Sequence, residues 1–208
     1  MTNKTVIAQK LLQINAIKIN IEQPFTWASG WKSPIYCDNR KILSYPFVRD
    51  FIKSELSNLV FSSFNDADMI AGVATAGIPW AVLIADQLKL PCIYVRPTPK
   101  AHGLGKQIEG EFKENQNVIV VEDLLSTGKS SLAVVEVLVK EGLKVNGVVS
   151  IFNYGFNTCS ESFAQKGITV ESLTDYEHLV KLLKDDGKVC EADEKALLNW
   201  RANPSDWK

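Results

Sequence analysis

The spacing of hydrophobic residues changes repeatedly along the chain, from a helical period to short continuous runs. Near the N-terminus, apolar residues at helical spacing predict a helix over residues 4–18. From residue 69 onward, short runs rich in β-branched residues alternate with helical segments. The runs lack alternating polar positions, which is typical of parallel strands that are buried on both faces.

These patterns predict an ordered series of strands and helices. The predicted strands cover residues 69–74, 92–95, 118–122, 145–151 and 169–173. The predicted helices that follow the first one cover residues 44–62, 78–88, 128–141, 158–166, 175–185 and 191–202. Two more short strands are expected between residues 24 and 37, around a Ser-Gly turn. This order indicates an α/β protein with a central parallel β-sheet flanked by helices.

One long segment, residues 96–117, shows almost no apolar periodicity. A loop of this length in a compact domain is usually functional or disordered. It carries the basic residues Arg96, Lys100, His102 and Lys106. Because it follows a strand of the parallel sheet, we expect it near the ligand-binding edge, where an enzyme can close it over a polyanionic group. The alternative is a solvated surface loop whose charges have no specific partner.

Composition excludes several classes of protein. The chain has 208 residues, of which 46% are hydrophobic and 23% charged, as in ordinary globular domains. A net charge of -1 gives no basic excess that would favour nucleic acid. No apolar run is long enough to span a membrane, and the N-terminus lacks a signal pattern. The four cysteines form no C-x-x-C pair, which argues against structural zinc and disulfides and predicts a cytoplasmic location.

The most informative stretch is residues 118–130, where a β-branched run leads directly to Glu122 and Asp123. A Ser-Thr-Gly loop at 126–128 and a helical pattern follow. In open α/β sheets, ligands bind at the carboxyl ends of the strands. Loop amides and a helix N-terminus favour a phosphate, whereas carboxylates only accept hydrogen bonds and so suit hydroxyl groups. The stretch therefore predicts a site for a ribose 5-phosphate.

Two simpler interpretations of this stretch explain less of it. Residues 128–130, Gly-Lys-Ser, resemble the end of a Walker A loop, but that motif requires a glycine where Asp123 stands. An ordinary strand-to-helix turn with a capping residue accounts for Ser126 and Thr127. It does not account for two adjacent carboxylates at the end of a buried strand, where an unpaired charge is costly.

Together these residues resemble the type I phosphoribosyltransferases, whose acidic pair and Ser-Thr-Gly loop bind phosphoribosyl pyrophosphate (PRPP). Further stretches narrow the resemblance to the orotate phosphoribosyltransferase branch of that family. They are F-T-W-A-S-G-W-K-S-P-I-Y-C-D-N-R at 25–40, G-V-A-T-A-G-I-P at 72–79, K-A-H-G at 100–103 and Q-I-E-G at 107–110. The resemblance covers nearly the whole chain and is weakest after about residue 185.

The resemblance implies the type I phosphoribosyltransferase fold, as one domain over residues 1–208. About residues 1–40 would contribute a small hood subdomain, and about residues 65–175 would form the PRPP-binding core. The implied reaction transfers the 5-phosphoribosyl group from PRPP to N1 of orotate, giving orotidine 5′-phosphate and pyrophosphate in de novo pyrimidine synthesis. The implied cofactor is Mg²⁺, held mainly by PRPP and water with no direct protein ligand. The implied assembly is a homodimer whose mobile loop reaches the neighbouring subunit's site, with no nucleic-acid or membrane partner.

The resemblance also assigns roles to individual residues. Glu122 and Asp123 would hold the ribose hydroxyls, and Asp123 would also be catalytic. The 5-phosphate would be held by Leu124, Leu125, Ser126, Thr127, Gly128, Lys129 and Ser130. The pyrophosphate would be bound by Thr75 and Ala76, and in the long loop by Arg96, Lys100 and His102. Lys100 and His102 would also be catalytic, and a cis peptide bond is expected at Ala74–Thr75.

Orotate is expected to contact a second group of residues, namely Ser126, Lys32, Tyr36, Cys37 and Tyr154. Lys32 and the backbone amides near Tyr36 and Cys37 are the candidates for its carboxylate, although Lys32 is equally interpretable as a solvated lysine beside a turn. The chain departs from the enterobacterial pattern at four positions where that pattern has basic residues. These positions are Ala28, Ala76, Pro97 and Tyr154.

Three other functions account for part of the sequence. A phosphoribosyltransferase for purines or other bases would share the PRPP motif but lack the S-G-W-K-S-P stretch at 29–34. A PRPP-sensing regulator would require a DNA-binding segment, and the sequence offers neither a helix-turn-helix pattern nor a basic excess. A purely structural α/β domain would leave the acidic pair and the long basic loop unexplained.

Overall fold

A six-stranded sheet forms the centre of the protein, whose computed structural model describes residues 3–27, 29–98, 106–205 and 207. The spatial order of its strands is β10-β9-β8-β5-β6-β7. The strands are β5 (Met69–Val73), β6 (Cys92–Val95), β7 (Ile108–Glu109), β8 (Asn117–Leu125), β9 (Lys144–Asn153) and β10 (Thr169–Asp175). All neighbouring pairs are parallel except β6 and β7, which are antiparallel. The predicted α/β class with a mostly parallel sheet is confirmed.

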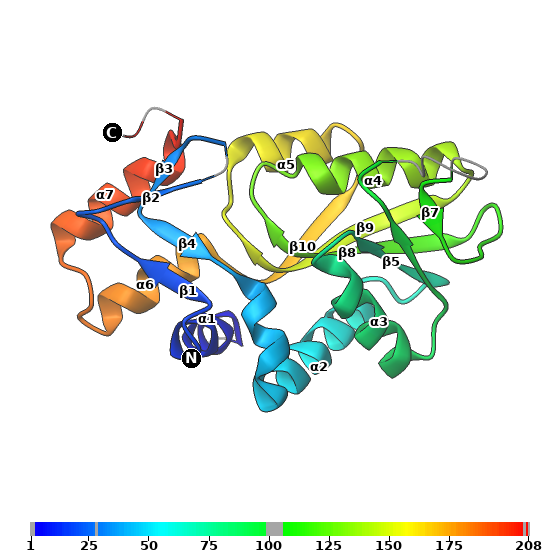
Figure 1. The fold of residues 1–208 in the computed structure, drawn as a ribbon, viewed down its shortest axis with the longest axis horizontal. Coiled ribbons are helices and arrows are strands. Elements are labelled where there is room, and N and C mark those ends of the chain that lie inside the picture. The colour runs from blue at the N-terminus through cyan, green and yellow to red at the C-terminus, as the bar shows by residue number, and fades with distance from the viewer. Residues whose placement is uncertain (1–2, 28, 99–105, 206, 208) are drawn as a thin grey trace.

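Helices cover both faces of this sheet (Figure 1). On one face lie α2 (Pro46–Ser63) and α3 (Gly77–Leu88), and on the other lie α4 (Lys129–Lys140) and α5 (Asn157–Ala164). Alternate residues of a strand point to opposite faces. In β8, Val121 therefore joins the hydrophobic cluster of α2 and α3, whereas Val120 joins that of α4 and α5. Burial on both faces explains why this strand reads as a continuous apolar run.

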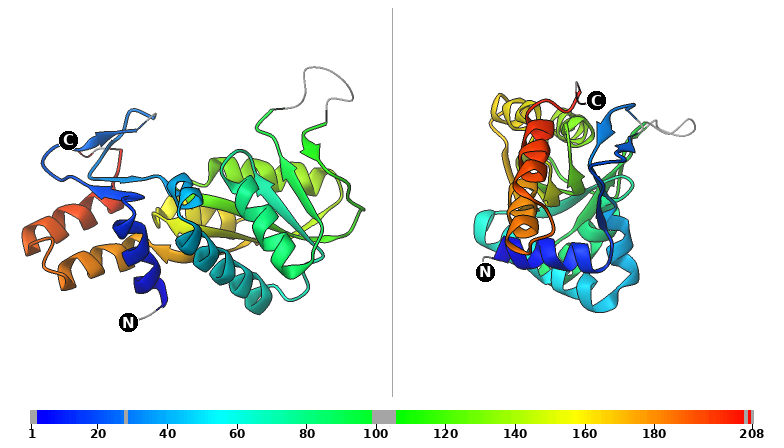
Figure 2. Two further views of the ribbon diagram at one scale, coloured as in Figure 1. Left: turned by 60° about the horizontal axis from the view of Figure 1, so that its bottom comes forward. Right: turned by 90° about the vertical axis from the view of Figure 1, so that its left-hand side faces the viewer.

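The N-terminal region adds two small antiparallel sheets beside the main one. They pair β1 (Ile17–Ile19) with β4 (Ile35–Cys37), and β2 (Phe25–Thr26) with β3 (Lys32–Ser33). We call β1 to β4 the hood strands. Figure 2 shows that the C-terminal helices α6 (Tyr176–Asp185) and α7 (Glu191–Ala202) lie against them. Trp200 of α7 donates from Nε1 to the Lys32 carbonyl at 2.9 Å, so the end of the chain holds the hood in place.

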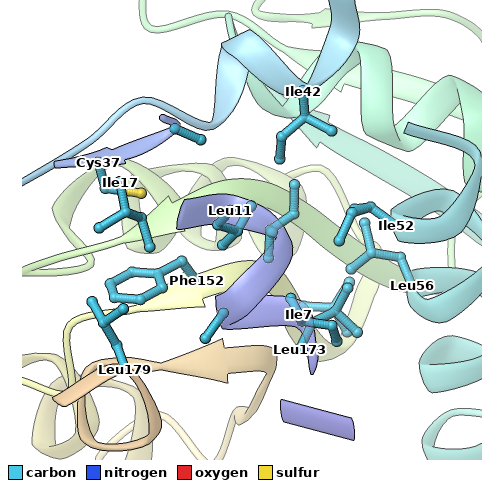
Figure 3. Packing of buried hydrophobic residues seen from close by; sticks show 14 of the residues in the cluster. Ile7, Leu11, Ile17, Cys37, Ile42, Ile52, Leu56, Phe152, Leu173 and Leu179 are labelled. Carbon is cyan, nitrogen blue, oxygen red and sulfur yellow. The ribbon is translucent and has the colours of Figure 1, made fainter. Parts of the chain in front are cut away.

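One hydrophobic cluster joins the hood to the main sheet (Figure 3). It includes Leu11 of α1 (Asn3–Gln13), Ile17 of β1, Ile52 of α2 and Phe152 of β9, each at most 2% exposed. Burying one such side chain stabilises the fold by roughly 1.5–3 kcal/mol. The hood is therefore fixed to the sheet by shared apolar contacts from distant parts of the sequence.

The first predicted helix was too long. It ends at Gln13 instead of residue 18, and residues 17–19 form β1. Asn15 turns the chain in the left-handed region at φ 54°, a conformation that asparagine tolerates better than most residues. The Ala16 amide donates to the Leu11 carbonyl at 2.9 Å and closes the helix end. The apolar residues after Asn15 continue the helical spacing by sequence but belong to a strand.

Three other elements also differ from their predictions. The 3₁₀ helix η1 (Asn39–Ser44) was not predicted, and neither was β7 within the segment 96–117. β7 pairs with Tyr94 and Val95 over only two residues, too few to show a period of two. Strand β8 continues to Leu125 rather than residue 122, so the acidic pair lies inside the strand.

Phe64, which follows α2, packs closely on Gly147 of β9. A Cβ atom at Gly147 would lie 2.3 Å from Phe64 Cε1. This contact sets the height of α2 above the sheet, since any side chain at residue 147 would push the ring away.

We therefore expect Gly147→Ala to destabilise the protein by about 1–3 kcal/mol through overpacking. In a Phe64→Leu background, the same substitution should destabilise the protein much less because the ring is absent. Urea unfolding of the wild type, both single variants and the double variant measures this coupling. Additive effects of the two substitutions would contradict the contact.

Candidate active site

Glu122 and Asp123 lie near the carboxyl end of β8, inside the main sheet. Glu122 is only 6% exposed. Its carboxylate accepts hydrogen bonds from the Asp123 amide at 3.1 Å and from Ser131 Oγ at 3.4 Å. Burial, together with the charge of Asp123, raises the pKa of Glu122 well above its usual range. No basic side chain forms an ion pair with Glu122 among the described residues, which is unusual for a carboxylate this deeply buried.

Asp123 is more accessible, and its backbone is fixed by the hood. Burial raises its pKa, while a hydrogen bond with Glu122 and the charge of Arg40 act in the opposite direction. The Asp123 carbonyl accepts a hydrogen bond from Asn39 Nδ2 at 2.7 Å. Asn39 Oδ1 in turn accepts from Cys37 Sγ at 3.3 Å. Burial raises the pKa of the Cys37 thiol well above its usual range, which keeps it a donor.

The loop after β8 presents a helix N-terminus to the same edge. Gly128 takes the left-handed conformation at φ 77°, and α4 begins at the next residue. A Cβ at Gly128 would lie 2.8 Å from Phe163 and 2.9 Å from Cys159. Glycine is therefore required both by the left-handed backbone and by the lack of space. Since Gly128 has no side chain to cap α4, the first-turn amides are available to an anion. Ser126 and Thr127 are half-buried beside them.

The turn that follows β5 lies next to this loop. β5 and β8 are parallel neighbours, but the chain passes from β5 to β6 on one side and from β8 to β9 on the other. This divergence of the two connections creates a crevice between the carboxyl ends of β5 and β8. The Ala74–Thr75 peptide bond is cis, as expected. A Cβ at Gly77 would lie 2.3 Å from the Val121 carbonyl oxygen, so only glycine allows this close approach.

A pocket of about 420 Å³ opens between the hood strands and the end of β8. Its lining residues are Thr26, Trp27, Tyr36, Cys37, Arg40, Leu124, Ser126 and Tyr154. Trp27 meets Tyr154 edge to face, with ring centroids 5.0 Å apart. Aromatic walls and one polar side suit a small planar ring.

Larger hollows lie elsewhere on the protein. One of about 760 Å³ is lined by residues that include Lys4, Glu55 and Glu171. It does not contain the acidic pair or the loop after β8. The smaller pocket is the better candidate because it adjoins both.

Most of the predicted orotate residues meet in this pocket. Ser126, Tyr36, Cys37 and Tyr154 all line it. Tyr154 is 1% exposed, and burial raises its pKa well above the usual range, so it forms a neutral wall. Lys32 does not line the pocket. Its Nζ donates to Thr26 Oγ1 at 2.7 Å, so it supports one wall from outside.

The predicted phosphate residues are distributed around the loop after β8. Thr127, Lys129 and Ser130 reach the surface to different degrees, and Leu124 is half-buried at the pocket. Leu125 differs from the rest because its side chain is 1% exposed in the core below α4. Only its backbone remains available to a ligand.

The predicted pyrophosphate residues are placed only in part. Thr75 and Ala76 lie in the turn after β5. Arg96 Nη1 lies 3.6 Å from Glu109 Oε1, and Gln107 Nε2 donates to the carbonyls of Arg96 and Pro97 at 2.8 and 3.2 Å. These contacts fix both ends of the long loop. Lys100 and His102 lie outside the described residues.

Four residues of this site were not predicted from the sequence: Thr26, Trp27, Asn39 and Arg40. All four lie in the stretch 25–40 that carried the family resemblance, which was the available signal. Their roles depend on how the hood strands lie over β8, and local spacing carries no information about that contact.

Over the described parts of the chain, no group of three or more His, Cys, Asp or Glu side chains is arranged to hold a metal ion. In the same residues, no helix is long and apolar enough to cross a membrane.

Comparisons with known proteins agree with this geometry. Residues 47–172 match the family described as phosphoribosyl transferase domain. The chain is 48% identical over 207 residues to an orotate phosphoribosyltransferase of Phocaeicola vulgatus, covering 100% of this chain and 98% of the relative. It is 50% identical over 206 residues to that of Bacillus subtilis, covering 98% and 95%. The crystal structure of an orotate phosphoribosyltransferase from Aeropyrum pernix superposes with a TM-score of 0.76 at 28% identity, covering 88% of this chain and 99% of that one.

The burial of Glu122 predicts an unusual pH dependence of stability. The unfolded chain ionises this group near pH 4, whereas the folded protein retains the proton to higher pH. The folded state then binds more protons, so stability falls as pH rises through the folded pKa. We expect Glu122→Gln to be more stable than wild type by about 1–3 kcal/mol at pH 8, the scale of a buried polar group's desolvation.

This difference should shrink as the pH falls toward about 4. Urea unfolding at a series of pH values measures it. Glu161→Gln, an exposed change on α5, is the matched control and should alter neither the stability nor its pH dependence. A stability difference for Glu122→Gln that does not vary with pH would contradict the role assigned to burial.

Proposed function

Since the chain belongs to the phosphoribosyltransferase family, in its orotate phosphoribosyltransferase branch, we propose that the pocket between the hood strands and β8 is its catalytic site. The protein transfers the 5-phosphoribosyl group from PRPP to orotate, giving orotidine 5′-phosphate and pyrophosphate in pyrimidine synthesis. One observation supports this site above others: an acidic pair, a helix N-terminus and an aromatic pocket adjoin at one crevice.

PRPP would occupy the crevice between β5 and β8. In this proposal, the carboxylates of Glu122 and Asp123 accept hydrogen bonds from the ribose 2- and 3-hydroxyls. Residues 124–130 hold the 5-phosphate, with the amides at the start of α4 as its main donors. The separation of carboxylates from loop amides supports this assignment, because each group faces the part of PRPP that suits its charge.

The pyrophosphate would lie toward the turn after β5. Thr75 and Ala76 offer backbone amides there, and Arg96 adds a positive charge at the base of the long loop. Lys100 and His102 complete the set by resemblance. Arg96 would exchange its contact with Glu109 for the pyrophosphate when PRPP binds.

Orotate would enter the aromatic pocket. Trp27 and Tyr154 offer ring surfaces, and Ser126, Tyr36 and Cys37 lie at the polar side. Lys32 would not contact orotate itself and would support the pocket by holding Thr26 through its Nζ. Because orotate arrives as an anion, the protein need not supply a strong general base.

Catalysis would follow from charge placement. The ribose carbon becomes oxocarbenium-like while the pyrophosphate gains negative charge. The carboxylates of the acidic pair would face the ribose and stabilise its developing positive charge, while Lys100 and His102 would stabilise the leaving group. Closure of the loop excludes water, which would otherwise hydrolyse PRPP. Contacts that become complete only near the transition state raise turnover.

Mg²⁺ fits the chemistry of this site. The half-buried side chains of Asp123, Ser126 and Thr127 offer hard oxygen donors, which Mg²⁺ prefers. PRPP and water would supply most of its ligands, with the acidic pair beside them. When bound, Mg²⁺ would neutralise charge on the pyrophosphate.

The proposal includes a homodimer of single-domain subunits in the cytoplasm. Large apolar side chains are exposed on adjacent helices: Phe47 at 93% and Phe61 at 72% on α2, and Val82 at 52% on α3. Phe47 and Phe61 lie about four helical turns apart and so face one side of α2. Such a surface suits a second copy. The four free cysteines agree with a reducing compartment.

Asp123→Asn should lower kcat by about 10²–10³-fold, the effect of one lost charge contact in a preorganised site. The amide keeps the shape of the side chain, so the melting temperature should remain close to wild type. Disappearance of orotate absorbance measures the activity. Asp186→Asn, which removes a charge from the surface between α6 and α7, should leave kcat unchanged. Turnover of Asp123→Asn within a few-fold of wild type would remove the acidic pair from the mechanism.

A mixed dimer tests whether the loop serves the neighbouring subunit. Lys100→Ala and Asp123→Asn subunits should each be nearly inactive as homodimers. If the loop acts across the interface, the mixed dimer has one site with both defects and one site with none. Activity should then return toward half of wild type per mixed dimer. Mixed dimers that assemble but remain inactive would show that each loop serves its own subunit.

A further inference from the structure

Arg40 is the one basic side chain among the described residues that line the aromatic pocket. It belongs to η1, directly after the hood strand β4, and its side chain is 63% exposed. The resemblance assigned it no role. Because Arg40 lines the same pocket as Leu124 and Ser126, it puts a positive charge beside the proposed binding site of orotate.

The geometry leaves much of this guanidinium free. Nε donates to Asp38 Oδ1 at 2.7 Å. This ion pair orients the planar group through one of its donors, while the terminal Nη groups carry the remaining N–H bonds. Two parallel N–H groups match the two oxygens of a carboxylate. An oriented guanidinium with a free edge is therefore prepared to bind a carboxylate in bidentate form.

The surrounding charges make such a cation necessary. Asp38 and Asp123 both act on Arg40, and Glu122 lies behind Asp123. An anionic base that entered this region would be repelled by those carboxylates. Lys32, the other candidate, does not line the pocket, and its Nζ is bonded to Thr26. Arg40 is the cation better placed to offset the repulsion.

We propose that Arg40 binds the carboxylate of orotate and thereby selects it over bases that lack this group. This inference rests on the proposed catalytic site, since it requires the base to occupy the aromatic pocket. Arg40 then determines specificity for the base, while the acidic pair and the loop after β8 act on PRPP. Asp38 is the residue that positions Arg40 by holding Nε.

Two nucleotides isolate the carboxylate in a binding experiment. Orotidine 5′-phosphate and UMP differ only by that group, and both carry the ribose 5-phosphate. Isothermal titration of each into wild type, Arg40→Gln and Arg40→Lys compares their dissociation constants. We expect Arg40→Gln to raise the dissociation constant of orotidine 5′-phosphate by about 10- to 100-fold, the effect of losing a hydrogen bond to a charged group. UMP should bind all three proteins with similar affinity.

Arg40→Lys keeps the charge but loses the fork, so it should recover part of the preference for orotidine 5′-phosphate. Lys41→Gln is the matched control, because Lys41 lies on the same helix and donates to the Asn15 carbonyl away from the pocket. It should alter neither affinity. Melting temperatures check that each variant is folded.

Two outcomes would overturn the inference. If Arg40→Gln weakened the binding of orotidine 5′-phosphate and of UMP equally, Arg40 would act on the ribose phosphate that both share, beside Asp123, and not on the carboxylate. If Arg40→Gln weakened the binding of neither nucleotide, the charge of Arg40 would play no part in binding the base. Failure of the proposed catalytic site would look different, because wild type itself would then bind neither nucleotide in competition with PRPP.

Discussion

The hydrogen bond from Asn39 to the Asp123 carbonyl is the contact on which the geometry of the site depends. It joins the start of η1, and with it the hood, to the strand that carries the acidic pair. Asn39 is completely buried, and its other amide atom receives the thiol of Cys37. A buried amide that lost either partner would incur a desolvation penalty of about 1–3 kcal/mol. This hydrogen bond therefore helps to hold the proposed base pocket and the proposed ribose site at a fixed distance.

The hood itself is stabilised from the far end of the chain. Trp200 is completely buried, and its ring centroid lies 5.7 Å from that of Trp27. Its Nε1 also donates to the Lys32 carbonyl. Tyr176 of α6 donates to the Leu197 carbonyl of α7 and so joins these two helices to each other. The aromatic wall of the proposed base pocket thus depends on helix α7. Precise positioning of a binding wall generally requires such support from behind.

The acidic pair shows a conflict between stability and function. Glu122 is buried beside a second carboxylate, which disfavours its ionised form and so weakens the fold at neutral pH. A protein selected for stability alone would place an apolar or amide residue there. Retention of two carboxylates near the carboxyl end of β8 is understandable when a ligand supplies hydroxyl groups and positive charge. Local inconsistency of this kind commonly marks functional sites.

The sequence by itself determined the class of fold and the center of the chemistry. Continuous β-branched runs between helical segments indicated a buried parallel sheet, and Glu122, Asp123 and the Ser-Thr-Gly loop indicated a ribose-phosphate site. Both signals are local, since strand burial and helix N-termini are encoded within a few neighbouring residues. The cis bond at Ala74–Thr75 was also predicted, through the resemblance of the surrounding stretch.

Only the tertiary structure decided how the hood meets the sheet. The turn at Asn15, the bond from Asn39 to β8 and the place of Arg40 in the pocket wall all join segments far apart in sequence. No periodicity reports such contacts, because side-chain spacing describes one element and not its neighbour. For the same reason Lys32 and Arg40, eight positions apart, could not be ranked as partners of the base until β3, η1 and β8 were placed together.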